Sequence, residues 1–581
     1  MIADGAKSWV AVTEELAATG PTAADTASPT TEPAAGVPPA GADSGRAVAR
    51  HSAQMATGSM LGRATGLVRT VAIGAAIGGA TFANNYALAN NLPNMVYELL
   101  LGGVLAAAVV PMLVRARADE ADGGVAYAQR LLSGATVALA VATVLAVACA
   151  PLLTRVIATG ANAADRRVIT LLGYLLLPEI FFYGLAALLG AVLNSRGRFA
   201  APMWAPILNN VVVTATAAAF VLVPTVARPP DPETATVMQI AVLGVGTTLG
   251  IIAQATALWP ALRRDGFRWR WRWDLRALHP RQLGRIGAWT LVYVVVNQVA
   301  VVVVLNIANH ARQPGPAIYN NAYLMVMMVY GVVAVSITTA LLPRMAAASH
   351  TRRHDDLAGL VAFGIRVSLV ILVPAAVAYL VLGRPIAVSL FEFGDFTHRD
   401  AVQTGWIITV GAFTLIPFGL NQLQVFTFYA MTDTRTPGLA NIPVAAIRIG
   451  IDLALYAVLP SVWVAAGLMA GNAVSFLVGL FLYAALLRRR LGRLPLRPVL
   501  DTGWRLAVAG LAAAAVTLLA LLAMQAATGT GKAASIAQTV VCGALLVATY
   551  LAVAYALGTP DLRRIVPAVW ARLGGGAGRG R

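Results

Sequence analysis

The sequence predicts an all-α polytopic membrane protein with about 14 transmembrane helices. Of its 581 residues, 58% are hydrophobic and only 12% are charged, and the mean hydropathy is +0.73. Apolar runs of about 20 residues, each long enough to cross a bilayer as a helix, recur along nearly the whole chain. These observations exclude a soluble protein and a β-barrel. The predicted spans are centred near residues 68, 100, 140, 180, 212, 248, 297, 330, 370, 415, 447, 474, 513 and 546.

The distribution of charge predicts the orientation of these spans. Residues 1–50 are rich in Ala, Thr, Pro and Gly and contain no apolar run, which indicates a disordered cytoplasmic tail and no signal peptide. If the loops alternate from a cytoplasmic N-terminus, the inside connections and the C-terminal tail carry 28 basic residues and the outside loops carry 8. The positive-inside rule therefore predicts a multi-pass protein of the cell membrane with both termini in the cytoplasm.

A weak internal repeat predicts two six-helix lobes. The second and eighth spans end around Pro111 and Pro343, and the connections after the fourth and tenth spans reach Pro202 and Pro437. The offsets, 232 and 235 residues, nearly agree, and an even number of helices per copy makes the lobes parallel repeats about an axis along the membrane normal. The predicted divisions are an N-lobe at 51–262, a linker at 263–285, a C-lobe at 286–490, two additional helices at 491–560 and a cytoplasmic tail at 561–581.

The predicted linker contains an alternation of tryptophan and arginine. Its residues 266–285 read GFRWRWRWDLRALHPRQLGR. Indole rings favour the membrane interface and guanidinium groups favour anionic lipid, so the pattern indicates a segment at the level of the cytoplasmic headgroups. Basic residues between aromatic residues also stack on nucleic acid. Because this segment is short and tethered to the membrane, we expect membrane lipids as its partner and no nucleic acid.

Ionised residues inside the predicted spans indicate a polar cavity. Arg63 and Arg69 lie in the first span, and Glu98 lies in the second span just past Pro93. An ionised side chain at mid-membrane costs from about 3 to more than 10 kcal/mol, so such residues usually face a water-filled cavity or a partner. The two arginines are about 9 Å apart along the helix and roughly 120° apart around it. Both suit an anionic ligand, because a guanidinium binds phosphate or carboxylate bidentately and keeps its charge; the alternative is snorkelling to the membrane surface.

Other polar residues of the spans have two interpretations. The second span carries asparagines at 84, 85, 90, 91 and 94, which supply donors and acceptors either for a ligand or for contacts between helices. Glu98 could pair with Arg69 or a cation, either as a structural ion pair or in a coupling role, and Glu179, next to Pro178 in the fourth span, has the same two interpretations. Arg448 and Asp452 have the spacing of a salt bridge within one helix.

Enzyme chemistry has no support in the sequence. No arrangement of His, Ser or Cys resembles a catalytic constellation, and neither a Gly-rich phosphate loop nor another nucleotide motif is present. The two cysteines lie within apolar runs, which argues against a disulfide or a metal site. We expect a transporter that uses no cofactor and no metal.

Five motifs in order resemble one family of transporters. They are GSMLGRATGLVRTVAIGAAIG from residue 58, NNLPNMVYELLLGGVLAAAVVP from 90, LGAVLNSRGRFAAP from 189, SLFEFGDFT at 389–397 and FYAMTDTRTP at 428–437. With these motifs, residues 50–560 resemble the MurJ/MviN lipid II flippases of the multidrug/oligosaccharidyl-lipid/polysaccharide (MOP) exporter superfamily. The arginine-rich composition and the form LPNMVYELLLGGVL resemble actinobacterial members.

The resemblance implies fourteen helices in two lobes around a cavity that opens alternately to each side. The implied substrate is lipid II, the undecaprenyl-diphosphate-linked disaccharide-pentapeptide precursor of peptidoglycan, which moves from the inner to the outer leaflet. The implied partners are lipid II, membrane lipids and proteins of cell-wall synthesis or division. In the family, arginines of the first helix are essential cavity residues, and they match Arg63 and Arg69. The candidate substrate-binding residues are Arg63, Arg69, Asn84, Asn91, Asn94, Tyr97 and Glu98, and the candidate coupling or structural charges are Glu179, Arg448 and Asp452.

The chain departs from the family at several charged positions. Asn84 stands where well-studied members have an acidic residue, and Tyr97 stands where they have an arginine. In the eighth span, Tyr323, Leu324 and Met327 replace an Asp-Arg pair and a following Glu. The resemblance therefore implies a less charged cavity. Some members are thought to hold a cation among the seventh, eleventh and twelfth helices, where Arg448 would supply a permanent positive charge and favour driving by the membrane potential.

Two alternatives to a lipid II flippase stay open. One is a flippase for another polyprenyl-linked glycan or a drug exporter of the same superfamily, although a drug exporter for cations would need acidic cavity walls. The other is a non-transporting membrane scaffold that recruits envelope-synthesis partners through its N-terminal tail and the Trp/Arg segment.

Overall fold

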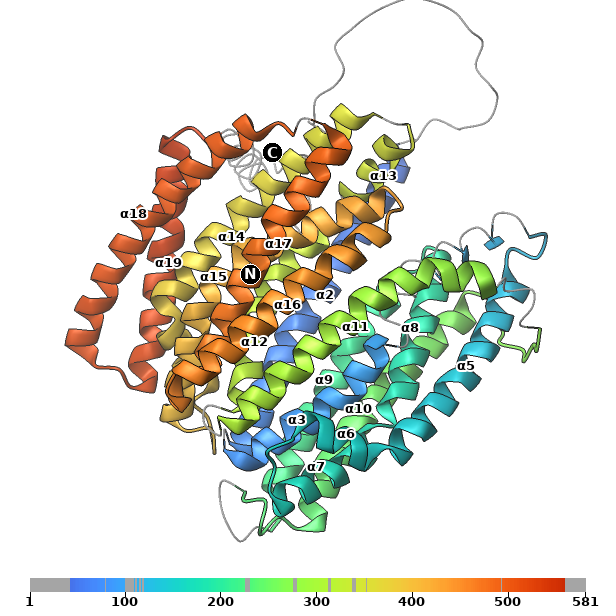
Figure 1. The fold of residues 1–581 in the computed structure, drawn as a ribbon, viewed down its shortest axis with the longest axis horizontal. Helices are drawn as coiled ribbons and strands as arrows, with labels where there is room; N and C mark the ends of the chain where they lie inside the picture. Colours follow the sequence, from blue (N-terminus) through green and yellow to red (C-terminus); the bar gives the residue numbers. More distant parts are fainter. Residues whose placement is uncertain are drawn as a thin grey trace, which may run out of the picture.

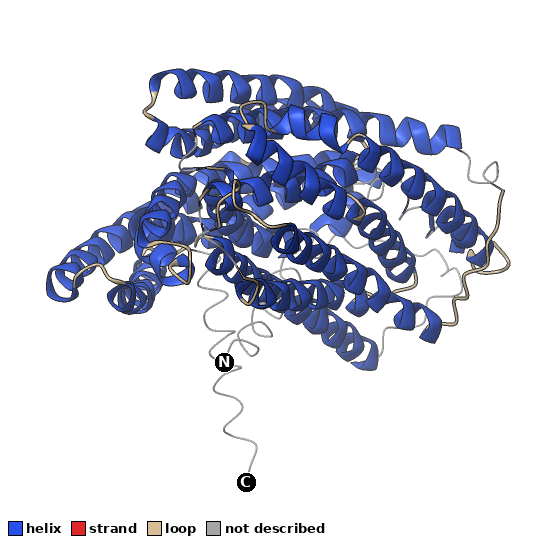
Figure 2. Ribbon diagram, turned by 90° about the horizontal axis from the view of Figure 1, so that it is seen from below, coloured by secondary structure: helices blue, strands red, loops and turns tan. Residues whose placement is uncertain are grey.

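The computed structural model describes residues 42–78, 80–99, 109, 112–113, 116–117, 120–224, 230–274, 280–311, 315–336, 341–351, 353–492 and 494–559. All regular elements within these ranges are helices (Figure 2). Several predicted features lie outside the described residues: the N-terminal tail up to residue 41, the centre of the second span near residue 100, Pro111, part of the linker at 275–279 and the C-terminal tail from residue 560.

The N-lobe begins at α2 and extends to α10. Its described helices are α2 (Ala42–Ile77), α3 (Thr81–Tyr97), α5 (Val125–Ala148), α6 (Ala150–Ile157), α7 (Ala163–Leu176), α8 (Glu179–Ser195), α9 (Ala200–Val221) and α10 (Val237–Arg264). Helices α7 and α8 form one span that is interrupted at Pro178. A proline in a helix interior removes a hydrogen bond and clashes with the preceding turn, which explains this break.

The C-lobe and two further helices follow. They are α11 (Pro280–His310), α12 (Pro316–Ser336), α13 (Leu342–His350), α14 (His354–Phe391), α15 (His398–Ala430), α16 (Arg435–Val458), α17 (Ser461–Leu491), α18 (Leu496–Thr528) and α19 (Lys532–Ala556). In the part of the chain that the structure describes, twelve helical stretches are long and apolar enough to cross a membrane. Helices α3 and α12 pack within the same bundle; α12 corresponds to the eighth predicted span, and α3 contains the first part of the second, whose centre lies outside the described residues.

Helix packing repeats between the two lobes. In the N-lobe, α2 packs on α9, α9 on α10, and α8 on both α5 and α10. The corresponding pairs in the C-lobe are α11 with α16, α16 with α17, and α15 with both α14 and α17. The same contacts in the same chain order confirm the parallel repeat. Helices α18 and α19 form an outer pair against α14 (Figure 1), where the Tyr550 hydroxyl donates to the Val370 carbonyl at 3.2 Å.

Residues 267–274 of the linker form no regular element and lie against α5. The Gln129 side-chain amide donates to the Arg268 carbonyl at 2.7 Å, and the Arg272 N–H donates to the Ser133 hydroxyl at 3.1 Å. Trp271 and Trp273 are exposed to 58% and 61%. The linker backbone is thus fixed to the N-lobe, Trp269 packs on Trp259, and Trp271 and Trp273 are exposed.

Candidate functional site: a cavity between the lobes

A cavity of about 420 Å³ lies where α2 and α3 of the N-lobe face α12 of the C-lobe. Pockets for small ligands usually have about 300–1,000 Å³, so this one is near the lower limit of that range. Its polar lining comes from Arg69 on α2, Asn90, Asn91 and Asn94 on α3, Asn209 on α9, Asn320 and Asn321 on α12, and three tyrosines, Tyr86, Tyr183 and Tyr323.

Arg69 supplies the positive charge of this cavity. Its side chain is half-buried, and no carboxylate among the described residues lies within 4 Å of its guanidinium. The predicted ion pair between Arg69 and Glu98 is therefore not formed in this structure. A half-buried guanidinium that no carboxylate of the described residues contacts within 4 Å is ready to bind an anion bidentately.

Arg63 lies beside the cavity and contacts the other lobe. Its Nη1 donates to the carbonyl oxygens of Met327 and Met328 on α12 at 3.4 and 3.5 Å. Gly331, one helical turn further along α12, leaves room for the guanidinium, since a Cβ at that position would overlap it. In this state Arg63 connects α2 to α12 and does not line the cavity, although the sequence groups it with Arg69.

The other predicted site residues of the second span divide between the cavity and its surroundings. Asn91 and Asn94 line the cavity, and the Asn91 side chain also donates to the Ala87 carbonyl at 2.8 Å. Asn84 lies outside the lining, and its Oδ1 accepts from the N–H of Ala317 at 3.1 Å. Tyr97 packs on the cavity residue Tyr183 with 5.6 Å between ring centroids. Glu98 directly follows Tyr97, is half-buried and does not line the cavity.

The candidate coupling charges lie away from the cavity lining. Glu179 is 1% exposed at the start of α8, where the Thr248 hydroxyl lies 3.3 Å from its carboxylate. The predicted pair of Arg448 and Asp452 is present within α16 at 3.6 Å, and the Asp452 side chain is fully buried. Gly471 on α17 packs directly on this carboxylate. The charges of the pair neutralise each other inside the C-lobe.

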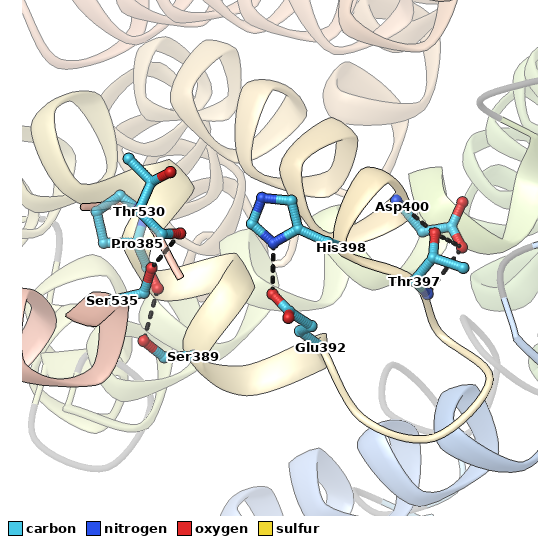
Figure 3. A network of polar contacts seen from close by, with 8 residues as sticks. All are labelled: Pro385, Ser389, Glu392, Thr397, His398, Asp400, Thr530 and Ser535. Atoms are coloured by element: carbon cyan, nitrogen blue, oxygen red, sulfur yellow. Dashed lines mark hydrogen bonds and ion pairs between the residues drawn. The ribbon is translucent and has the colours of Figure 1, made fainter. Parts of the chain in front are cut away.

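The lobes also meet beyond the cavity, at the end of the bundle where α2 passes into α3; we call this the α2–α3 end. There the Asp395 N–H, in the α14–α15 loop, donates to the Ala75 carbonyl of α2 at 2.8 Å. Phe396 packs on Gly74, and Gly394 has φ +56° and no room for a Cβ beside the Ala75 carbonyl. Figure 3 shows how this loop is held: His398 Nδ1 lies 2.6 Å from the Glu392 carboxylate, and Thr397 and Asp400 cap α15.

Sequence reasoning missed three amides of the cavity. Asn209, Asn320 and Asn321 line it together with the predicted residues. A signal was present, because Asn320-Asn321-Ala322-Tyr323 follows Asn84-Asn85-Tyr86-Ala87 at an offset of 236, close to the offsets of the internal repeat. Within the described part of the chain, no group of three or more His, Cys, Asp or Glu residues could hold a metal ion.

The chain is similar to one family of known proteins along most of its length. The sequence model of the family "Lipid II flippase MurJ" matches residues 73–539. A probable lipid II flippase MurJ of Rhizobium meliloti (strain 1021) is 26% identical over 523 residues, which cover 87% of this chain and 94% of the relative. One of Haemophilus influenzae is 25% identical over 411 residues, which cover 68% and 78%.

Solved structures agree with this fold. The chain matches a lipid II flippase MurJ in an inward closed conformation with a TM-score of 0.67 and 17% identity, covering 86% of this chain and 97% of that one. It also matches an inward-facing multidrug resistance MATE family transporter of the MOP superfamily, with a TM-score of 0.55 and 14% identity, covering 74% and 94%. At these identities the structural matches establish the fold alone.

Proposed function

The chain belongs to the lipid II flippase MurJ family, and on that premise we propose that it moves lipid II from the inner to the outer leaflet by alternating access, with Arg69 as the anchor of the anionic headgroup. The family consists of transporters, and no enzymatic step is involved. The observation that carries the proposal is the position of Arg69, a guanidinium in a cavity between two lobes with no carboxylate of the described residues within 4 Å.

Two contacts between the lobes support alternating access. On one side of the cavity, Arg63 bridges α2 to carbonyl groups of α12, and at the α2–α3 end, Asp395 bonds to Ala75. The cavity volume, about 420 Å³, suffices for one part of a large headgroup only. The lobes must therefore separate to admit the rest. We propose that Arg63 first meets the headgroup when its contact with α12 opens, which reconciles its family role with its present position.

The membrane potential is a sufficient driving force for this transport. Moving one elementary charge across 100 mV changes the free energy by about 2.3 kcal/mol. An anionic diphosphate leaving an inside-negative cell gains roughly twice that amount, provided that Arg69 stays with the protein. In the C-lobe, Arg448 places a permanent positive charge 3.6 Å from the buried Asp452 carboxylate, which is consistent with driving by the potential.

The orientation follows from the basic residues. We propose that the protein lies in the cell membrane with both termini in the cytoplasm. The described connections opposite the α2–α3 end carry Arg196, Arg198, Arg268 and the run Arg488 to Arg490, as the positive-inside rule requires. At that level, the exposed Trp271 and Trp273 would lie among the headgroups of the inner leaflet. We expect proteins of cell-wall synthesis or division as further partners.

The test is complementation in cells depleted of their native flippase. Wild-type chain should restore exposure of lipid II at the outer leaflet, whereas Arg69→Ala at matched expression should not. Arg155→Ala, which removes an exposed arginine of α6, is the matched control and should rescue fully. Failure of the correctly inserted wild type would favour another polyprenyl-linked glycan as substrate.

A second arm of the same experiment addresses a membrane scaffold. Deletion of residues 1–41, which precede α2, should leave a transporter active, whereas a scaffold that recruits partners through this tail should fail. Full rescue by Arg69→Ala would contradict the anchor role and move the site elsewhere.

A further inference from the structure

Several asparagine side chains within the described helices join one helix to another. Asn85 donates to the Asp165 carboxylate at 2.8 Å, Asn210 to the Gly62 carbonyl at 2.9 Å and Asn472 to the Tyr319 hydroxyl at 3.0 Å. Asn306 donates across the lobes to the Val156 carbonyl at 2.7 Å. These amides join one helix to another, which is the usual structural role of polar residues within a membrane.

The amides of the cavity form a different class. Within the described residues, no hydrogen bond joins the side chain of Asn90, Asn94, Asn320 or Asn321 to another group, and all four line the cavity. Asn209 also lines the cavity, but it is 5% exposed and its Oδ1, which has no hydrogen-bond partner, packs against Gly250 of α10. Asn90, Asn320 and Asn321 are half-buried and Asn94 is exposed. Because contacts between helices do not use these side chains, they are available to a polar ligand.

The chemistry of these side chains selects the ligand. A primary amide offers two donors and one acceptor without charge, so it pairs with groups that both donate and accept, such as hydroxyl and acetamido groups. Tyr183 and Tyr323 add aromatic faces, and Leu324 and Met327 add apolar surface. A second anion-binding site would need a second cation, and Arg69 is the charged residue of the lining in the described part of the chain.

We propose that the four amides, Asn90 and Asn94 on α3 and Asn320 and Asn321 on α12, bind the N-acetylated glycan of the lipid headgroup while Arg69 binds its anionic part. The proposal rests on the proposed function and defines how the cavity distinguishes lipid II from other polyprenyl diphosphates. Two of the amides come from each lobe. A glycan held by both pairs therefore contacts both lobes.

Binding of two lipids by the purified protein in nanodiscs tests the proposal. The probes are lipid II and undecaprenyl diphosphate, which share the tail and the diphosphate and differ in the glycan-peptide. Wild type should bind lipid II more tightly. Asn320→Ala combined with Asn321→Ala should weaken lipid II binding about 10-fold, as expected for two lost hydrogen bonds, and leave undecaprenyl diphosphate within about 2-fold. Arg69→Ala should weaken both lipids equally.

The controls separate the possible outcomes. Asn297→Ala removes an amide that donates to the Tyr293 carbonyl of its own helix at 2.8 Å and should change neither affinity. Retained binding of undecaprenyl diphosphate shows that a variant is folded. Equal affinity of wild type for both lipids, or an equal loss of both in the double variant, would overturn the glycan assignment. Binding of neither lipid by wild type would overturn the proposed function instead.

Discussion

The two walls of the cavity differ in charge. The N-lobe wall contains Arg69 together with the amides of α3, whereas the C-lobe wall on α12 is neutral, with two asparagines, Tyr323, Leu324 and Met327. The C-lobe does contain ionised groups, but Arg448 and Asp452 pair inside it. From this comparison we propose that the anionic part of the substrate binds to one lobe, while both lobes share the neutral hydrogen bonding. Substitutions can alter this asymmetry or the contacts that bring the walls together.

Removal of the charge from the N-lobe wall should have the largest effect. Arg69→Ala should lower transport of lipid II about 100-fold, because a charge-assisted bidentate contact contributes roughly 1.5–3 kcal/mol. Arg69→Lys keeps the charge and loses the planar fork, so we expect about a 10-fold loss. Transport is measured as lipid II that becomes accessible across proteoliposomes. Similar rates for Arg69→Ala and wild type would show that the asymmetry of the walls has no function.

Preventing the walls from meeting at the α2–α3 end should have the next largest effect. Gly394→Ala places a Cβ against the Ala75 carbonyl and forces a residue with a side chain to adopt φ +56°. We expect a shift of about 10-fold toward separation of the lobes, since left-handed backbone alone costs about 1–2 kcal/mol. The shift is measured as the distance between spin labels at Thr81 and Arg399, both exposed at this end, in a cysteine-free background.

Gly492→Ala is the matched control for this substitution. Gly492 also has a positive φ, +77°, at the end of α17 with no atom near its absent Cβ, so an alanine there strains the backbone without touching the contact between lobes. An equal distance change in both variants would refute the role of the α14–α15 loop in closing the lobes.

A smaller effect is expected from moving Arg63 without removing it. Gly331→Ala should displace the guanidinium from the Met327 and Met328 carbonyls, because its Cβ would occupy the same space and the arginine tip is free to move. Loss of one such hydrogen bond corresponds to about 1 kcal/mol, or a few-fold shift toward opening. The distance between spin labels at Arg198 and Arg344 measures this opening, with Gly450→Ala in α16 as the control. No change in Gly331→Ala would mean that the Arg63 contact does not hold the lobes.

The smallest effect concerns the Asp265 carboxylate, which follows α10 in the N-lobe. Burial alone would raise the pKa of Asp265, but hydrogen bonds from Arg198 and Arg196 outweigh it and hold the pKa below its ordinary value. The stabilisation is present above an unfolded-state pKa of about 3.9 and is lost as the pH falls through the lowered pKa of the folded protein. Asp265→Asn should lower Tm by about 2–4 °C at pH 7 and abolish the difference in strongly acidic solution.

Asp274→Asn is the comparison for this stability measurement. Asp274 is 52% exposed and lies 3.6 Å from Arg130, and such surface pairs contribute about 0–1 kcal/mol. A Tm loss in Asp274→Asn as large as that in Asp265→Asn would contradict the special role of the buried pair.

Hydropathy alone predicted the spans, because every span must bury about 20 apolar residues in lipid whatever its neighbours are. Two proline offsets predicted the parallel repeat, which the packing of α11 with α16 and of α2 with α9 confirms. Arg69 was also predictable, since a guanidinium deep in an apolar helix has few alternatives to a polar cavity.

The remaining features depend on tertiary contacts that local patterns do not specify. Arg63 differs from Arg69 because backbone carbonyls more than 260 residues away accept from it, and carbonyl groups have no signature in sequence. The motif at 389–397 was recognisable, but its contact with Ala75 was not. The sequence does not distinguish an asparagine that joins helices, such as Asn85, from one that faces a cavity, such as Asn320.

The most direct test of the account is photo-crosslinking of a lipid II analogue that carries a photoreactive group on its glycan. The purified protein is irradiated with the bound analogue, and the labelled peptides are identified by mass spectrometry. We predict label on α3 around Asn90 and Asn94 and on α12 around Asn320 and Asn321, with loss of both in Arg69→Ala. Label confined to one wall, or to α16 and α17 near Asp452, would contradict a headgroup site shared by the two lobes.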